Sequence, residues 1–140
     1  FLKDDLCPLG VVTSRGPTAR EQEDGDIGLR VARTLASLDI GQTVVVKERV
    51  VVALEALEGT DAAIRRAHAL GGKGVVVVKT ASPNHDRRFD LPVIGQDTIT
   101  TCGECGVSCL VVEAMSTLLL DRQAVVAMAN RVGLCLTGVT

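Results

Sequence analysis

The run GVVVVK at positions 74–79 is the feature that most constrains the fold of this chain. An unbroken series of valines leaves no polar side for solvent, which is typical of a strand covered on both faces of its sheet. Two more β-branched runs, TVVVK at 43–47 and RVVVALEA at 49–56, have almost nothing between them. They predict a tight antiparallel hairpin.

Helical patterns alternate with these strands. From Asp26 the apolar residues recur with the helical period until Gly41 breaks the pattern. An Ala-rich helix begins at Thr60 and Asp61 and stops at a pair of glycines. Further helices are predicted over 96–105 and over 121–130, with Asp121 as the cap of the second, and further strands over 108–114, 117–120 and 134–139. This alternation predicts an α/β layered domain, with a mixed β-sheet containing one antiparallel hairpin and flanked by about four helices.

The length of 140 residues suits one domain with one buried core. Residues 1–25 carry Pro, Gly and an acidic run, which predicts an irregular inter-domain linker or arm, and residues 26–140 form the domain. Aromatic residues make up 1% of the chain, so the core must consist of Val, Leu, Ile and Ala. Because the sequence opens with Phe1, we expect it to be part of a longer protein.

Charge, composition and the length of the apolar runs argue against nucleic acid as a partner and against a transmembrane span. The net charge of −2 and the near absence of aromatic residues do not favour binding to nucleic acid. No apolar run approaches the ~20 residues of a transmembrane span, and no signal peptide is visible.

Cys102 and Cys105 form a C-x-x-C, a spacing that suits a zinc site or thiol–disulfide exchange. A structural zinc site normally needs four ligands, and a second paired spacing is missing from the sequence. A redox pair would stand at the start of a helix, whereas these thiols fall at the end of the helix predicted over 96–105. We therefore expect core packing, with a metal or redox role as the alternative.

The loop at 79–92, KTASPNHDRRFDLP, follows the buried strand at its carboxyl end, where α/β folds usually bind ligands. Phosphate chemistry needs cations to neutralise oxygens and a carboxylate to hold Mg²⁺ or a water molecule. The loop offers both kinds of group, and a solvated surface loop with local ion pairs is the alternative. Its polar residues are Lys79, Asn84, His85, Asp86, Arg87, Arg88 and Asp90.

A second candidate is EALEGTDAAI at 55–64. Structural roles alone can explain these residues, with Thr60 as an N-cap and Asp61 beside the positive end of the helix dipole. The alternative is an anion site, in which Thr60 and backbone N–H groups bind a phosphate. Gln42, at the mouth of the hairpin, is a third and weaker candidate.

Three segments taken together resemble a known family: LDIGQTVVVKERVVVALEALEGTDAAIRRA, VVKTASPNHDRRFDLPVIGQDTI and VVEAMSTLLLDRQAVVAMANRVGL. They are similar, in the same order, to the C-terminal domain of the LpxI family, bacterial UDP-2,3-diacylglucosamine pyrophosphatases of lipid A biosynthesis. The match runs from about Asp26 to Gly138. It rests on D-I-G-Q, E-G-T-D and a K…P-N-x-D-x-R-x-D-L-P loop occurring together.

The resemblance implies Mg²⁺-dependent hydrolysis of a lipid-linked sugar nucleotide to 2,3-diacylglucosamine 1-phosphate and UMP. It implies that Asp90 is the catalytic carboxylate and engages Mg²⁺ or the attacking water, with Asp61 assisting in catalysis and metal binding. The motif positions expected to contact substrate are Gln42, Thr60, Lys79, Asn84 and Arg88. His85 departs from the family, which commonly has Gln there, so detailed substrate contacts do not transfer directly.

The resemblance also implies partners. Family members carry an N-terminal domain and hold the lipid product between their two domains, so this domain alone should have little or no activity. We further expect a homodimer, because the arm at 1–25 has too few apolar residues to fold alone, and a cytoplasmic location, with peripheral attachment to the inner membrane as a further option. The alternative function is a non-catalytic binding or dimerisation module for a phosphosugar or lipid phosphate.

Overall fold

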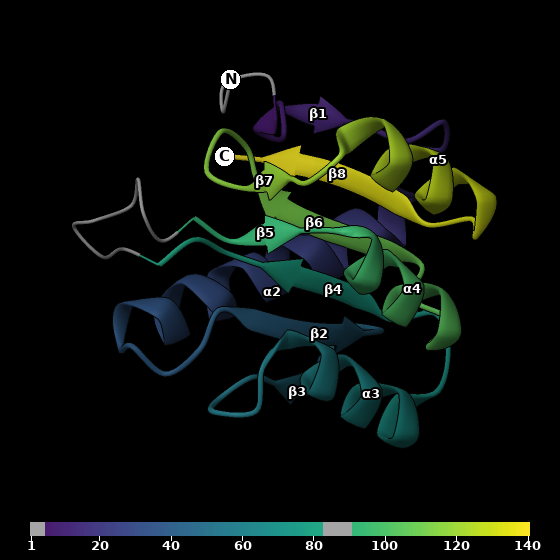
Figure 1. Cartoon of the computed structure of the whole chain (residues 1–140). Helices are drawn as coiled ribbons and strands as arrows, with labels where there is room; N and C mark the ends of the chain where they lie inside the picture. Colours follow the sequence, from purple (N-terminus) through teal and green to yellow (C-terminus); the bar gives the residue numbers. More distant parts are fainter. Residues whose placement is uncertain (1–4, 83–90) are drawn as a thin grey trace.

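The computed structural model, which describes residues 5–82 and 91–140, has a mixed six-stranded sheet at its centre (Figure 1). Strands β4, β6 and β8 are parallel to one another, whereas β1 pairs antiparallel with β8, and β2 pairs antiparallel with both β3 and β4. The predicted mixed sheet with one hairpin is therefore confirmed. In the order β1-β8-β6-β4-β2-β3, the strands are Gly10–Val11, Cys135–Val139, Cys109–Glu113, Val76–Lys79, Thr43–Lys47 and Val50–Leu54.

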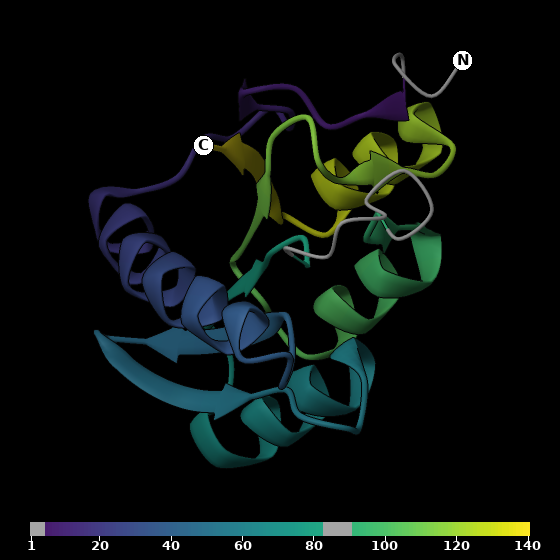
Figure 2. The same cartoon turned by 90° about the vertical axis from the view of Figure 1, so that its left-hand side faces the viewer.

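Helices cover both faces of this sheet (Figure 2). Helix α2 (Ala19–Ser37) packs on one face, mainly against β2 and β4. Helices α3 (Thr60–Gly71), α4 (Gln96–Glu104) and α5 (Arg122–Arg131) lie on the other. Within the described ranges this gives the four flanking helices that the sequence predicts.

The valines of β4 explain why that strand is apolar throughout. Val76 and Val78 pack with Ala32 of α2, whereas Val77 belongs to the opposite cluster with Ile64 of α3. All three valines are almost completely inaccessible to solvent. Alternate side chains of one strand thus enter two separate cores, which is the arrangement predicted from the unbroken run.

Helix α2 approaches the sheet so closely that it needs a glycine. A Cβ at Gly28 would stand 2.6 Å from a methyl carbon of Val78. Contacts this short are almost never tolerated between carbon atoms, so Gly28 sets the distance between the helix and β4.

The start of α2 corrects the sequence reading of residues 1–25 as irregular. The helix begins at Ala19, because Thr18 and Glu21 form a capping box in which each side chain accepts a hydrogen bond from the backbone N–H of the other. Residues 10–11 form β1 and pair with β8. Much of the predicted arm therefore packs as part of the domain, although its role relative to any further domain stays a prediction.

Two short strands make a separate parallel pair beside the main sheet, β5 (Val93–Ile94) and β7 (Leu118–Leu119). The predicted strand at 117–120 contains β7, whereas β5 is too short to have a recognisable sequence pattern. Asp121 occupies the N-cap position of α5, but with φ of 56° its side chain makes no capping hydrogen bond. Asp121 therefore holds the predicted N-cap position, but its side chain does not cap the helix.

None of the helices in the described part of the chain is both long enough and apolar enough to cross a membrane.

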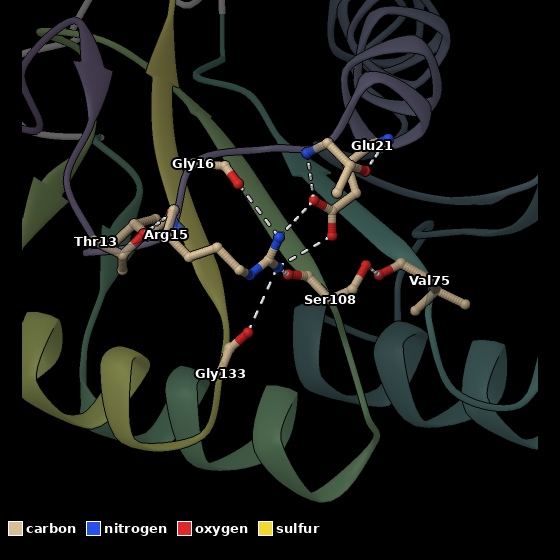
Figure 3. Close-up of polar contacts among 9 residues, drawn as sticks. Thr13, Arg15, Gly16, Glu21, Val75, Ser108 and Gly133 are labelled. Carbon is tan, nitrogen blue, oxygen red and sulfur yellow. Dashed lines mark hydrogen bonds and ion pairs between the residues drawn. The ribbon is translucent and has the colours of Figure 1, made fainter.

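A partly buried ion pair ties the segment before α2 to the strands (Figure 3). The guanidinium of Arg15 donates to both carboxylate oxygens of Glu21, at 2.8 and 3.1 Å, and to the carbonyl oxygens of Ser108 and Gly133. The side chain of Glu21 is only 8% exposed. Ser108 and Gly133 precede β6 and β8, so this contact holds the start of α2 against the amino ends of two central strands.

This ion pair predicts a specific loss of stability in acid. Burial disfavours the ionised form of Glu21, but hydrogen bonds from Arg15 and from Thr18 outweigh it and lower its pKa from 4.5 to about 2. A lowered folded-state pKa stabilises the fold above the unfolded pKa, and that stabilisation is lost as pH falls from 4.5 towards 2. The loss should reach about 2–3 kcal/mol. Urea unfolding across this range should show it, and Glu21→Gln should flatten the curve.

The matched control is Glu104→Gln, which alters an exposed carboxylate paired with Arg65. It should leave the pH dependence unchanged, because exposed ion pairs contribute little. An equally steep acid transition in Glu21→Gln would assign the effect to other carboxylates.

Candidate functional site

One edge of the sheet gathers the chain positions that the sequence singled out. Because β2 runs antiparallel to β4, the start of β2 lies beside the end of β4, and Thr43 is the register partner of Lys79. Lys79 also lies beside Val112, near the end of the parallel strand β6. This is the carboxyl edge of the parallel strands, where ligands bind in most open α/β sheets.

The amino end of α3 reaches the same edge. The hydroxyl groups of Thr43 and Thr60 are 3.1 Å apart, which joins the start of β2 to the first residue of the helix. Gly59, with φ of 93°, occupies the N-cap position, so the predicted N-cap role of Thr60 is wrong. Asp61 lies in the first turn, as predicted. The free N–H groups and the dipole at this helix end favour negative charge nearby.

Lys79 is a half-buried cation of this edge. Burial lowers the pKa of its ammonium group below the usual value, and the nearby carboxylates of Glu55 and Asp61 oppose that shift. A partly desolvated cation interacts with an incoming anion more strongly than one in open solvent. The position therefore suits the neutralisation of a phosphate oxygen.

Backbone hydrogen bonds fix the entrance to the hairpin. The N–H of Gln42 donates to Oε1 of Glu55 at 2.9 Å, and the N–H of Thr80 donates to the carbonyl oxygen of Gln42 at 2.9 Å. Gly41 leaves room for this contact, because a Cβ there would overlap the carbonyl oxygen of Glu55. The D-I-G-Q segment is thereby held against the ends of β3 and β4.

A cavity of about 220 Å³ opens beside this entrance. It lies between the end of α2 and the residues that follow β3, and its lining includes Asp39, Gln42, Glu55 and Ser82. The remaining lining residues are Ala36, Ile40, Gly41 and Ala56.

The structure thus brings together Gln42, Thr60, Asp61 and Lys79 from three separate motifs. Asn84, Arg88 and Asp90 lie outside the described residues, as do His85, Asp86 and Arg87. In the described ranges, no three His, Cys, Asp or Glu side chains lie close enough to form a metal site. The predicted pair of metal ligands, Asp61 with Asp90, stays a prediction.

Glu113 is a residue of this edge that sequence reasoning missed. Its Oε1 accepts a hydrogen bond of 2.7 Å from the N–H of Ala81, and its Oε2 accepts from Nε and Nη2 of Arg33 at 3.0 and 2.9 Å. The side chain therefore anchors the chain just after Lys79 to both β6 and α2. The sequence signal that could have identified Glu113 is a single carboxylate at the end of an apolar strand, in SCLVVEA at 108–114.

The cysteine segment is part of the core. Cys102 and Cys105 are buried among apolar residues of α4 and its neighbours, which confirms the packing interpretation. Burial raises the pKa of the Cys102 thiol to about 12, so the reactive thiolate is disfavoured at neutral pH. Cys109 begins β6, within the strand predicted over 108–114.

Comparison with known proteins adds a family. Residues 8–137 match the model of the LpxI C-terminal domain. The UDP-2,3-diacylglucosamine pyrophosphatase LpxI of Caulobacter vibrioides is 40% identical to this chain, over 94% of the chain and 50% of that relative. The chain therefore spans about half the length of the curated relative that it matches.

Proposed function

This chain belongs to the LpxI C-terminal domain family, and from this premise we propose that it is one half of a pyrophosphatase of lipid A biosynthesis. The proposed substrate is UDP-2,3-diacylglucosamine, and the products are 2,3-diacylglucosamine 1-phosphate and UMP. In the reaction a water oxygen forms a bond to phosphorus, and the bridging P–O bond breaks. The complete activity requires the other half of the protein, since this chain covers only half of its relative.

The observation that carries this proposal is the meeting of three motifs at one sheet edge. Thr60 and the amino end of α3 offer a hydroxyl group and N–H groups to a phosphate, and half-buried Lys79 offers a cation. Asp61 supplies a carboxylate at the same place. An edge that combines anion-binding groups with a carboxylate suits phosphoryl chemistry better than binding of a neutral ligand.

The groups at this edge fit a magnesium ion. Mg²⁺ prefers oxygen ligands and is often held by only one or two carboxylates together with substrate phosphates. Asp61 has the required chemistry at the required edge, and we propose Asp90 as its partner. When bound, the ion would neutralise phosphate charge and polarise the phosphorus centre. The residues of the chain bind and orient the substrate. Lys79 and Thr60 hold phosphate oxygens, and Arg88 balances further phosphate charge.

An activity assay tests this function. The full-length protein should release UMP from UDP-2,3-diacylglucosamine in the presence of Mg²⁺, and excess EDTA should stop the release by removing the ion that neutralises phosphate charge. Chromatographic detection of UMP and of the lipid phosphate measures both products. Adding Mg²⁺ back should restore the rate, whereas turnover that continues in EDTA would contradict the metal assignment.

A second candidate function is a binding module for a phosphosugar, favoured by the anion-binding end of α3 and by the partial coverage of the relative. Calorimetry with UMP, with and without Mg²⁺, separates the two functions. Binding that ignores both Mg²⁺ and the Asp90→Ala change would favour the module. The expected homodimer and the cytoplasmic location also stay proposals, and sedimentation velocity would test the first.

A further inference from the structure

Two cysteines face each other across paired strands, at the opposite edge of the sheet from Lys79. Cys109 begins β6 and Cys135 begins β8, and the two are direct register partners in the parallel ladder. Both are free and fully buried, and both belong to the core cluster on the α2 side of the sheet. Their side chains therefore leave neighbouring strands on the same face.

The spacing of paired strands suits a disulfide bond. Neighbouring strands lie ~4.7–4.9 Å apart in the hydrogen-bonding direction. A disulfide usually joins Cα atoms that are ~4.4–6.8 Å apart. The thiols of Cys109 and Cys135 are already hydrogen-bond partners. Joining them therefore needs new side-chain rotamers and no change in the pairing of β6 with β8.

The surroundings favour one thiolate within this pair. The hydrogen bond from the Cys109 thiol lowers the pKa of Cys135, and the guanidinium of Arg15 lowers it further, against the effect of burial. The same hydrogen bond and burial raise the pKa of Cys109. Arg15 is held there by the carbonyl oxygens of Ser108 and Gly133, just before the two strands (Figure 3). The two sulfurs thus share one proton, and the first proton leaves the pair more readily than it leaves a lone buried thiol.

A cavity of about 300 Å³ leads to this pair. It lies between α2 and the strands β6 and β8, and its lining includes Cys109, Gln22 and Leu29. Neither thiol is exposed to bulk solvent. A reagent close to water in size can enter such a cavity, whereas a bulky one is kept away from the sulfurs.

We propose that Cys109 and Cys135 form a reversible oxidation site, which closes to a disulfide with hydrogen peroxide as the oxidant. The thiolate of the pair attacks a peroxide oxygen, and the O–O bond breaks. The departing hydroxide takes up the proton that the thiol had lost, giving water and a sulfenic acid. The second thiol attacks the sulfenic sulfur, and its proton leaves with the hydroxyl group as a second water. Two electrons pass from the sulfurs to the peroxide.

The groups around the pair favour oxidation over a zinc site. Zinc in a structural site needs about four ligands from Cys, His or carboxylates. Across residues 5–82 and 91–140, no three such side chains cluster around a common point. Two neighbouring thiols with a guanidinium beside them instead combine an attacking sulfur with a resolving one. This inference does not depend on the proposed function, because it concerns the amino ends of the strands.

Mass spectrometry of the full-length protein tests the proposal. The protein is treated with hydrogen peroxide while folded, then unfolded in urea with iodoacetamide to block the remaining thiols. Two thiols per chain should escape blocking, because the disulfide has consumed them, and the mass before blocking should fall by about 2 Da, the two hydrogens lost. After trypsin, the peptide 89–122 should be linked to the peptide that begins at Val132 and carries Cys135. Dithiothreitol should reverse both changes.

The variants identify the two sulfurs. Cys109→Ala and Cys135→Ala should each lose the linked peptide completely, and alanine suits the apolar cluster around these positions. Cys105→Ala is the matched control, since Cys105 is buried on the other side of the sheet and lies outside the ladder. It should form the linked peptide as the wild type does. The wild-type measurement decides the question even where a variant is unstable.

The linked peptide in the wild type, reversed by dithiothreitol and absent from both pair variants, would establish the site. Full blocking of every thiol after peroxide treatment would overturn the proposal and make the pair ordinary core packing. Oxygen atoms added to single cysteines without a linked peptide would overturn it too. So would a linked peptide that persists in Cys109→Ala, because peptide 89–122 also carries Cys102 and Cys105.

Discussion

Replacing Asp90 by alanine in the full-length protein should abolish Mg²⁺-dependent release of UMP from UDP-2,3-diacylglucosamine. The proposal gives this carboxylate the task of engaging the metal ion or the attacking water. Loss of a positioned group that takes part in proton transfer typically lowers the rate about 100- to 10,000-fold. The rate constant kcat, measured at saturating substrate, should carry most of the effect.

Thermal unfolding separates an effect of Asp90→Ala on chemistry from an effect on folding. The chain before it is anchored at Ala81 by Glu113, and the chain after it enters β5 at Val93. Thermal unfolding of Asp90→Ala should therefore match the wild type. Asp97→Ala, in the first turn of α4, is the matched control and should retain activity. A fully active Asp90→Ala protein would remove Asp90 from the mechanism.

Substituting alanine for Gly41 should cost both stability and activity. The new Cβ would overlap the carbonyl oxygen of Glu55, and backbone atoms cannot move aside as a flexible side chain does. The start of β2 would have to separate from the end of β3, which breaks the hydrogen bond between Gln42 and Glu55. The free energy of unfolding should fall by about 2–4 kcal/mol, in the range of strongly disruptive substitutions.

Urea unfolding measures this loss, and the UMP assay measures its effect on the site. Gly16→Ala is the matched control, because the nearest neighbour of a Cβ there would be 3.5 Å away and the backbone angle is ordinary. It should change stability by no more than about 0.5 kcal/mol. If Gly41→Ala were as stable and as active as Gly16→Ala, the close approach between D-I-G-Q and β3 would not matter.

The central sheet could be predicted because its signals are local. The four valines before Lys79 require cover on both faces, and the hairpin follows from two β-branched runs with a minimal turn. The start of α2 was missed even though T-x-x-E at 18–21 is a capping-box pattern. The surrounding Pro, Gly and acidic residues masked the signal, and Glu21 faces inward because Arg15 pairs with it.

The residues of the site could be predicted only where they belong to a recognisable sequence motif. Gln42, Thr60, Asp61 and Lys79 lie at one edge because the antiparallel step from β2 to β4 aligns a strand start with a strand end. Glu113 was missed as a functional candidate, and so was the contact between Glu55 and Gln42, because both depend on pairing between strands distant in sequence. Such pairing is a property of the folded sheet and has no local pattern.

The place of β8 in the sheet has a consequence for biosynthesis. This strand lies between β1 and β6, yet the ribosome makes it after every other strand of the sheet. Until residues 135–139 leave the exit tunnel, β6 has an unpaired edge and β1 has no partner. The nascent chain therefore exposes an apolar strand edge until β8 is added, the stage at which binding by a chaperone would best prevent aggregation.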